Sequence, residues 1–196
     1  MKRLAITGGI GSGKSTVCRL LAEVGGVEVY DSDSRAKEIM NSHPQVVAEV
    51  EALFGPEAYK EGVLNRPYIA QRAFADKELL GRLNAIVHPR VVEDYEQWVA
   101  CQSGPYVVLE SALLFSSPLE GHYDVSVAVV APDEIRVQRC VARDGATPEQ
   151  IRERMARQMS GEEFAKRADF VVNADGVEPL LPQVEALDKW VRELKK

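Results

Sequence analysis

The chain has 196 residues, of which 45% are hydrophobic and 28% charged, an ordinary composition for a globular domain with a substantial core. Its formal net charge of −6 argues against a general affinity for nucleic acid or anionic membranes, and no apolar run approaches the ~20 residues of a membrane-spanning helix. The first predicted strand begins near residue 3, which leaves no room for a cleavable signal peptide. Three cysteines without metal-ligand spacing, Cys18, Cys101 and Cys140, fit a reducing cytoplasm.

A phosphate-binding loop near the N-terminus is the strongest signal in the chain. Residues 7–16 read TGGIGSGKST and satisfy the pattern G-x-x-x-x-G-K-S/T. The preceding segment, 3–7, is apolar enough for a buried strand. After the loop, apolar residues recur at the spacing of a helix that we expect to end at Gly25-Gly26. A strand, a glycine-rich loop and a helix in this order predict binding of a nucleoside triphosphate.

The residue types of the loop explain how it would hold phosphates. Glycines let the backbone approach an anion, and the backbone N–H groups and the helix N-terminus attract negative charge. Lys14 can reach the β- and γ-phosphates, and the Ser15 hydroxyl can bind Mg²⁺. We assign nucleotide binding to Gly9, Gly11, Ser12, Gly13, Lys14, Ser15 and Thr16.

Further elements follow along the chain. Short apolar runs predict four more strands, over 27–30, 106–109, 125–130 and 170–172. Residues 35–101 read as almost wholly helical, and we expect Pro44, Gly55-Pro56, Pro67 and Pro89 to divide them into short helices. The remaining predicted helices cover 133–143, 148–159 and about 177–194.

Strands that alternate with helices predict a three-layer α/β fold around a parallel five-stranded sheet. Ligands of such sheets bind beyond the carboxyl ends of the strands. We expect one domain with three parts. The core is about 1–34, 105–138 and 168–196, the helical substrate-binding insertion is about 35–104, and the lid is about 139–167.

Two carboxylates follow the second predicted strand. Asp33 could accept the proton of an attacking hydroxyl, and Asp31 could help to hold Mg²⁺ through water. Asp33 could equally be a helix-capping residue, since Ser32, Asp33 and Ser34 all suit that position. The residues alone leave both interpretations open.

Three arginines and one histidine are further candidates. Arg136, Arg139 and Arg143 are spaced to share one helix face, which could stabilise charge on a transferred phosphoryl group. They could also form ordinary surface ion pairs with neighbouring acidic residues. His88 precedes Pro89 at an expected helix break, and a lone histidine is more often structural than catalytic.

With these residues in view, the chain resembles the dephospho-CoA kinase family over nearly all of its length. The resemblance begins with the phosphate loop and continues with Asp31-Ser32-Asp33, which looks like that family's D-x-D. The other matching segments are Leu64-Asn65-Arg66, Phe74, Ile86-Val87-His88-Pro89, Arg139, Arg143, Gln158 and Ala168-Asp169 with Asn173. The phosphate loop alone specifies a superfamily, and the ordered set of matches is more specific.

The resemblance implies a P-loop kinase fold, ATP with Mg²⁺ as donor and the ribose 3′-hydroxyl of dephospho-CoA as acceptor. It implies that Asp33 is the general base, with Lys14 and Arg143 also catalytic, and that Arg139 and Asn173 help to bind ATP. Acceptor binding would fall to Thr7, Asp33, Arg66, Phe74, His88 and Arg90. We expect no nucleic-acid or membrane partner, and a monomer or small homo-oligomer.

One segment departs from the family pattern. The family usually has a P-L-L-F-E-like stretch after the third strand, where this chain has Ala112 in place of proline and Ser116 in place of the acid. Glu110 and Glu120 carry carboxylates nearby, but neither is at the matching position. The departure concerns acceptor binding rather than the nucleotide site.

Two other functions compete with this prediction. A nucleoside monophosphate kinase of the same fold would need a pocket for the phosphate of its acceptor. A nucleotide-switched binding protein of the GTPase kind would normally show an N-K-x-D motif after a strand, and the sequence has none.

Overall fold

The computed structural model describes residues 1–194, apart from the side chain of Phe74. The chain forms two compact units, which we call the sheet unit and the helical unit. The sheet unit comprises Met1–Asp31 and the chain from Gln102 onward, and the helical unit is Ser32–Cys101. Among the described residues, no helix is both long and apolar enough to cross a lipid bilayer.

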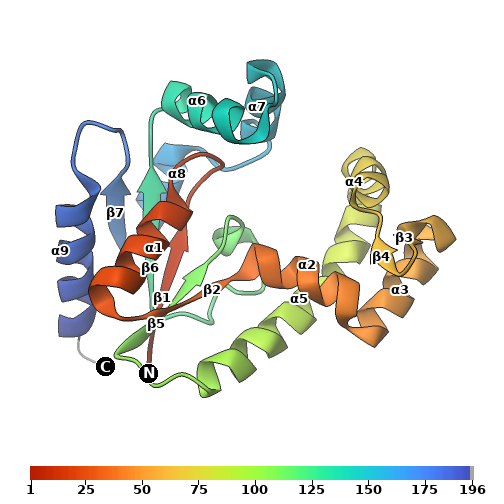
Figure 1. Ribbon diagram of the computed structural model, residues 1–196, viewed down its shortest axis with the longest axis horizontal. Helices are drawn as coiled ribbons and strands as arrows, with labels where there is room; N and C mark the ends of the chain where they lie inside the picture. Colours follow the sequence, from red (N-terminus) through yellow and green to blue (C-terminus); the bar gives the residue numbers. More distant parts are fainter. Residues whose placement is uncertain (195–196) are drawn as a thin grey trace. The chain divides into compact units, whose positions relative to one another are not determined.

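A parallel five-stranded sheet forms the centre of the sheet unit, as the sequence predicts. The strands stand in the order β2-β5-β1-β6-β7 (Figure 1). Their bounds are β1 Lys2–Thr7, β2 Glu28–Asp31, β5 Tyr106–Glu110, β6 Val125–Val130 and β7 Phe170–Asn173. The register pairs Glu110 with both Ile6 and Asp31, so the carboxyl ends of the three strands β2, β5 and β1 lie side by side. This edge carries the phosphate loop.

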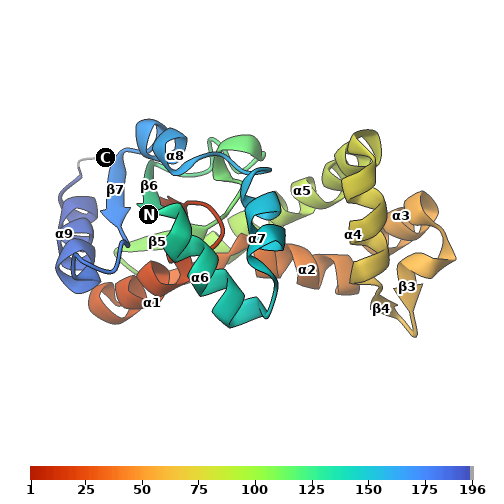
Figure 2. The same ribbon diagram turned by 90° about the horizontal axis from the view of Figure 1, so that it is seen from above.

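Helices cover both faces of this sheet. On one face α1 (Lys14–Gly25) packs against α9 (Leu180–Glu193), and α8 (Gly161–Arg167) and η2 (Leu114–Ser116) lie on the other (Figure 2). The core under α1 and α9 consists mainly of aliphatic side chains of the strands and of these two helices, together with Tyr106 and Cys18. Gly26, at φ 59°, caps α1 in the left-handed conformation, where the sequence predicts the helix to end.

The helices α6 (Asp133–Asp144) and α7 (Pro148–Met155) form a smaller cluster of their own around Val137, Cys140 and Ile151. The predicted helix over 148–159 is shorter than expected. It ends at Met155, and α8 begins after Ser160, whose hydroxyl accepts from the backbone N–H of Glu163 in a capping box.

The helical unit contains four helices and a small hairpin. Its elements are α2 (Ser32–Ser42), α3 (Pro44–Phe54), η1 (Pro56–Ala58), β3 (Tyr59–Lys60), β4 (Val63–Leu64), α4 (Arg66–Ala75) and α5 (Lys77–Ala100). Pro44 and Pro67 stand at the starts of α3 and α4, where a missing N–H costs no hydrogen bond. These two helix boundaries agree with the prediction.

Two expectations for this unit are wrong. Pro89 does not divide a helix, because α5 continues through it, and His88 therefore lies within a helix rather than at a break. The buried face of α5, with Val87, Val91 and Tyr95, holds the helix together despite the lost hydrogen bond. The hairpin of β3 and β4 was also not predicted, because each strand has only two residues.

Candidate active site at the phosphate loop

The phosphate loop connects β1 to α1 and folds back on itself. The Ser12 N–H donates to the Gly9 carbonyl at 3.2 Å, and the N–H groups of Thr16 and Val17 both donate to Gly13, which begins the helix. Gly11 has φ +75°, and a side chain there would collide with the backbone carbonyl of Arg136. The glycines are thus required by both the conformation of the loop and its close packing.

Lys14 lies over the loop that precedes it. Its Nζ donates to the carbonyl of Gly8 at 2.9 Å and to that of Gly9 at 3.3 Å. Two hydroxyls of the same segment, those of Thr7 and Ser12, are buried and make no hydrogen bond within the described residues. Polar atoms of this kind suit a ligand that brings its own hydrogen-bonding groups.

A serine and two carboxylates meet at the neighbouring strand ends. The Ser15 Oγ donates to the Oε1 of Glu110, the last residue of β5, at 2.8 Å. Asp31 pairs in register with Glu110. Burial raises the pKa of the adjacent Cys18 thiol well above its usual value, and its hydrogen bond with Glu110 and the negative charge of Glu110 raise it further.

These oxygen atoms fit a magnesium ion. Mg²⁺ in nucleotide sites is usually held by one or two carboxylates together with phosphate oxygens and water. Ser15, Glu110 and Asp31 supply such a donor set, while the described residues contain no cluster of three His, Cys, Asp or Glu that could hold a metal without the nucleotide. The sequence prediction assigned Ser15 and Asp31 but not Glu110. The position of Glu110 at the end of the third strand was the signal available.

The three arginines of α6 have different environments. Arg139 donates from Nη1 to the carbonyls of Gly11 and Ser12, and from Nη2 to that of Ala174 at 2.7 Å. The side chain of Arg143 is 63% exposed and forms a two-bond ion pair with Asp144. That hydrogen bond raises the pKa of Arg143. Arg139, predicted to help to bind ATP, thus contacts two backbone carbonyls of the loop, whereas the hydrogen bonds of Arg143 go to Asp144.

Arg136 is a second residue, besides Glu110, to which the sequence prediction gave no role in the site beyond membership of the three-arginine helix face. The residue is 4% exposed, and its guanidinium donates to the Ile10 carbonyl and to Asp133. A fully buried arginine is rare unless its donors are used. The spacing of Arg136, Arg139 and Arg143 pointed to this helix face, but not to which arginine is buried.

A cavity of about 350 Å³ is lined in part by Gln158, a residue that contacts the loop. Gln158, which accepts from the Ile10 N–H at 2.8 Å, belongs to both the loop's surroundings and the cavity wall. The segment that departs from the family pattern lines it with Ala112, Leu113, Phe115 and Ser116, and Arg157, Met159, Glu163 and Phe164 complete the wall. The mixture of apolar and charged side chains suits an organic ligand that carries both kinds of group.

Asn173 ends β7 at the far side of the same sheet edge, opposite Val130 of β6. Its backbone N–H donates to the Oε1 of Gln183, and its carbonyl accepts from the Nε2 of the same side chain. The next residue, Ala174, is the one whose carbonyl Arg139 contacts. Asn173 is therefore next to Ala174, which shares its partner Arg139 with Gly11 and Ser12 of the phosphate loop.

The remaining predicted residues belong to the helical unit. Asp33 is exposed and lies in the first turn of α2, where a carboxylate is favourable to the helix dipole. Arg66 begins α4, and Arg90 of α5 pairs with Glu93 and donates to Gln45 at 2.7 Å. Burial lowers the pKa of His88. The side chain of Phe74 lies outside the described residues.

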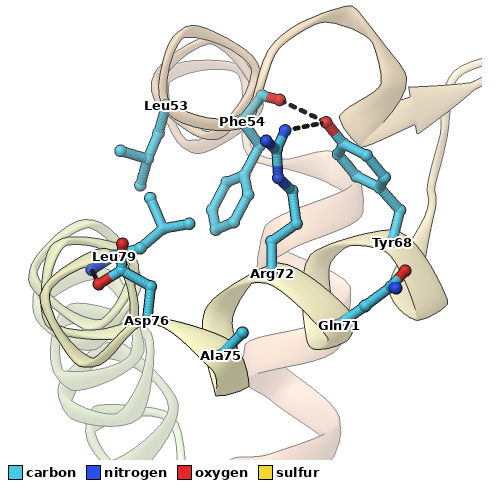
Figure 3. A pocket seen from close by; sticks show the side chains of 8 residues that line it. All are labelled: Leu53, Phe54, Tyr68, Gln71, Arg72, Ala75, Asp76 and Leu79. Atoms are coloured by element: carbon cyan, nitrogen blue, oxygen red, sulfur yellow. Dashed lines mark hydrogen bonds between the residues drawn. The ribbon is translucent and has the colours of Figure 1, made fainter.

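The helical unit has a cavity of its own, of about 590 Å³ (Figure 3). Leu53, Phe54 and Leu79 form its apolar wall, and the Tyr68 hydroxyl donates to the Phe54 carbonyl and accepts from Arg72 at 2.6 Å. The rest of the lining is Gln71, Ala75 and Asp76. Of the predicted acceptor residues whose side chains are described, none lines it.

The loop, its lysine and serine, and the carboxylate on the neighbouring strand together define a P-loop nucleotide-binding protein with a kinase-like sheet. Two solved structures share this fold. A protein from Thermus thermophilus, TT1252, is 37% identical with a TM-score of 0.85, covering 100% of this chain and 98% of that one. The dephospho-CoA kinase of Campylobacter jejuni shares the fold at 22% identity and a TM-score of 0.63, covering 97% and 96%.

Sequence comparison specifies the family. The dephospho-CoA kinase family profile matches residues 3–179. A dephospho-CoA kinase of Bacteroides fragilis is 43% identical over 183 residues, which is 93% of this chain and 89% of that protein. The chain belongs to the dephospho-CoA kinase family, a family of ATP-dependent kinases, as its motifs indicate.

Proposed function

We propose that this chain transfers the γ-phosphoryl group of ATP to the ribose 3′-hydroxyl of dephospho-CoA, which gives coenzyme A and ADP. The observation that carries the proposal is the arrangement of Lys14, Ser15 and Glu110 at the carboxyl edge of the sheet, in a chain of this family. That edge supplies the donor half of the reaction. The acceptor is inferred from the family.

The donor half rests on the phosphate loop. The loop N–H groups and the start of α1 would bind the phosphates, and Lys14 would exchange its bonds to Gly8 and Gly9 for bonds to the β- and γ-phosphates. Ser15, with Glu110 and Asp31 nearby, would hold Mg²⁺. A bound Mg²⁺ neutralises phosphate charge as the transferred group moves.

The acceptor half needs a base. We assign it to Asp33, which follows Asp31 by two residues along the chain and is exposed at the start of α2. The 3′-oxygen attacks the γ-phosphorus, the bond from phosphorus to the β,γ-bridging oxygen breaks, and the hydroxyl proton passes to the Asp33 carboxylate. ADP leaves with the bridging oxygen. Helix capping by Asp33 is the alternative that the test must separate.

The other residues have supporting roles in the proposal. Arg139 holds the loop and Arg143 would approach the phosphates by leaving Asp144, with Asn173 near the adenine of ATP. Thr7, Arg66, Phe74, His88 and Arg90 would bind the acceptor. The cytoplasmic location and the state as a monomer or small homo-oligomer remain predictions.

The test is ADP production from Mg·ATP with and without dephospho-CoA, with coenzyme A identified as the product. We expect strong dependence on the acceptor, and Asp33→Asn should lower kcat by on the order of 10²–10⁴-fold with little change in ATP binding. Glu38→Gln is the matched control, because Glu38 is an exposed acid of the same helix that pairs with Arg35.

Two results would contradict the proposal. Turnover that ignores dephospho-CoA but responds to a nucleoside monophosphate would assign the chain to a different acceptor. An Asp33→Asn variant that keeps its kcat and loses only thermal stability would make Asp33 a helix-stabilising residue.

A further inference from the structure

One residue of the phosphate loop, Ile10, is attached to the α6–α7 region at three points. Its carbonyl accepts from the Nε of Arg136 at 3.0 Å, and its N–H donates to the Oε1 of Gln158 at 2.8 Å. Its side chain packs against the cluster of Val137, Cys140 and Ile151. Both polar backbone atoms of a loop residue are thus held by side chains more than a hundred positions away in the sequence.

Arg136 makes this attachment rigid because it is buried. Its side chain is 5% exposed, its Nη1 pairs with Asp133 at 2.9 Å, and its Nη2 is buried without a hydrogen-bond partner among the described residues. A buried guanidinium with an unused donor is costly, and apolar replacements of buried charges are often neutral or stabilising. A requirement of folding alone would therefore not select an arginine here.

The unused end of Arg136 lies against the loop. A Cβ atom on Gly9 would overlap Nη2, and one on Gly11 would be 2.5 Å from the Arg136 carbonyl. The side chain and the backbone of the same arginine thus bound the loop at two glycines. Since Arg136 cannot withdraw without breaking its bonds to Ile10 and Asp133, it limits the paths that the loop can take.

We infer that Arg136 and Gln158 are positioning residues that hold the phosphate loop in its nucleotide-binding shape, with the fixed positive charge of Arg136 directly behind the loop. The inference rests on the proposed role of the loop in binding ATP phosphates. Neither residue needs to touch the phosphates, because each acts through the Ile10 peptide groups. The N–H groups of a preformed loop are ready for an anion without a cost of ordering.

The test measures binding of Mg·ADP by calorimetry, which does not depend on turnover. Arg136→Met keeps the volume but removes the charge and the donors, and it should raise the Kd for Mg·ADP by about 10-fold or more. Arg136→Lys keeps a charge that can reach the Ile10 carbonyl and should recover most of the affinity. The matched control is Arg152→Met, because Arg152 pairs with Glu134 in the same region but is exposed.

Steady-state kinetics separate positioning from general loss of structure. Arg136→Met should raise the KM for ATP and leave the KM for dephospho-CoA near the wild-type value, whereas a merely structural defect would lower the active fraction for both substrates alike. If Arg136→Met fails to fold, Gln158→Met tests the same loop from its N–H side and should show the same selective loss.

Two results of these binding measurements would contradict the role of Arg136 and Gln158. Wild-type affinity for Mg·ADP in both Arg136→Met and Gln158→Met would overturn the inference, as would an equal loss in Arg152→Met. Failure of the proposed function is a separate result, because it would appear in the wild-type chain as turnover independent of dephospho-CoA while Mg·ADP binding remained.

Discussion

The phosphate loop and the charged residues of the helical unit differ in which of their atoms are held: backbone atoms in the loop and side chains in the helical unit. Polar atoms of the loop are contacted by side chains from remote segments, such as Arg139 and Gln158. In the helical unit, charged side chains contact other side chains within the unit, as Arg90 does with Glu93 and Gln45. The loop is contacted by several remote segments of the sheet unit, whereas Arg90, a predicted acceptor residue of the helical unit, pairs with side chains of its own unit.

The difference indicates where specificity for each substrate comes from. A loop that is held from several sides loses its conformational entropy during folding rather than on binding. Its backbone N–H groups can therefore bind phosphates without a further entropic cost. Locally paired side chains such as Arg90 must exchange a partner for the ligand, and exposed pairs of this kind contribute little energy. Apart from the proposed base Asp33, we expect substitutions at the loop to cost far more activity than substitutions of paired side chains such as Arg90 in the helical unit.

Among substitutions that test this comparison, the largest effect should come from Lys14→Met, because Lys14 belongs to the loop itself. Loss of the ammonium that lies over Gly8 and Gly9 removes a charge from the phosphates, and kcat should fall on the order of 10²–10³-fold. Steady-state turnover with circular dichroism of the fold checks this. Lys189→Met, at an exposed lysine of α9 that pairs with Glu193, should keep normal turnover. A Lys14→Met variant with normal turnover would disprove the assigned site.

Glu110→Gln should have a smaller effect and sharpen the comparison. The amide keeps the shape but weakens the hold on a cation next to Ser15, so the Mg²⁺ concentration for half-maximal activity should rise about 10-fold at fixed ATP. Titration of activity with Mg²⁺ measures it. Glu120→Gln is the control, because Glu120 pairs with Arg167 at the surface. Unchanged magnesium dependence would remove Glu110 from the metal site.

The smallest effect concerns His88 in the helical unit. Because burial lowers the pKa of His88, the unfolded chain binds the proton more readily than the folded one. The contribution to stability is therefore present above the ordinary histidine pKa of 6.5 and is lost as the pH falls below that value. Thermal unfolding across this range should show a shallower loss of stability for His88→Gln than for the wild type. An identical loss would contradict the prediction.

Much of the fold follows from short sequence patterns. The five strands are predictable because each is an apolar run of a buried parallel sheet, and the end of α1 is set by Gly26. The prediction at Pro89 was wrong because the tendency of proline to end helices takes no account of packing. The buried face of α5 keeps that helix continuous. The hairpin around Glu61-Gly62 was not predicted, since strands of two residues are too short to show an alternating pattern of apolar side chains.

Site residues within one sequence motif were predictable, whereas residues that the fold brings together from remote segments were not. Lys14 and Ser15 follow from the loop motif itself. Glu110 was visible in the sequence as a nearby carboxylate, but only the register places it beside Asp31 and Ile6. Arg136 could not be distinguished from Arg139 and Arg143, because burial of one face of α6 depends on which segment packs there. The roles of Asp33 and the acceptor residues stay predictions.

The pair of hydrogen bonds between Gln183 and Asn173 has a consequence for self-association. β7 is an edge strand, and an edge offers unpaired N–H and C=O groups to which another chain can add a strand. The Gln183 amide occupies both groups of Asn173, much as a sixth strand would. The side chain therefore protects the last residue of a four-residue edge against intermolecular β-pairing, and its loss would show first as aggregation during refolding.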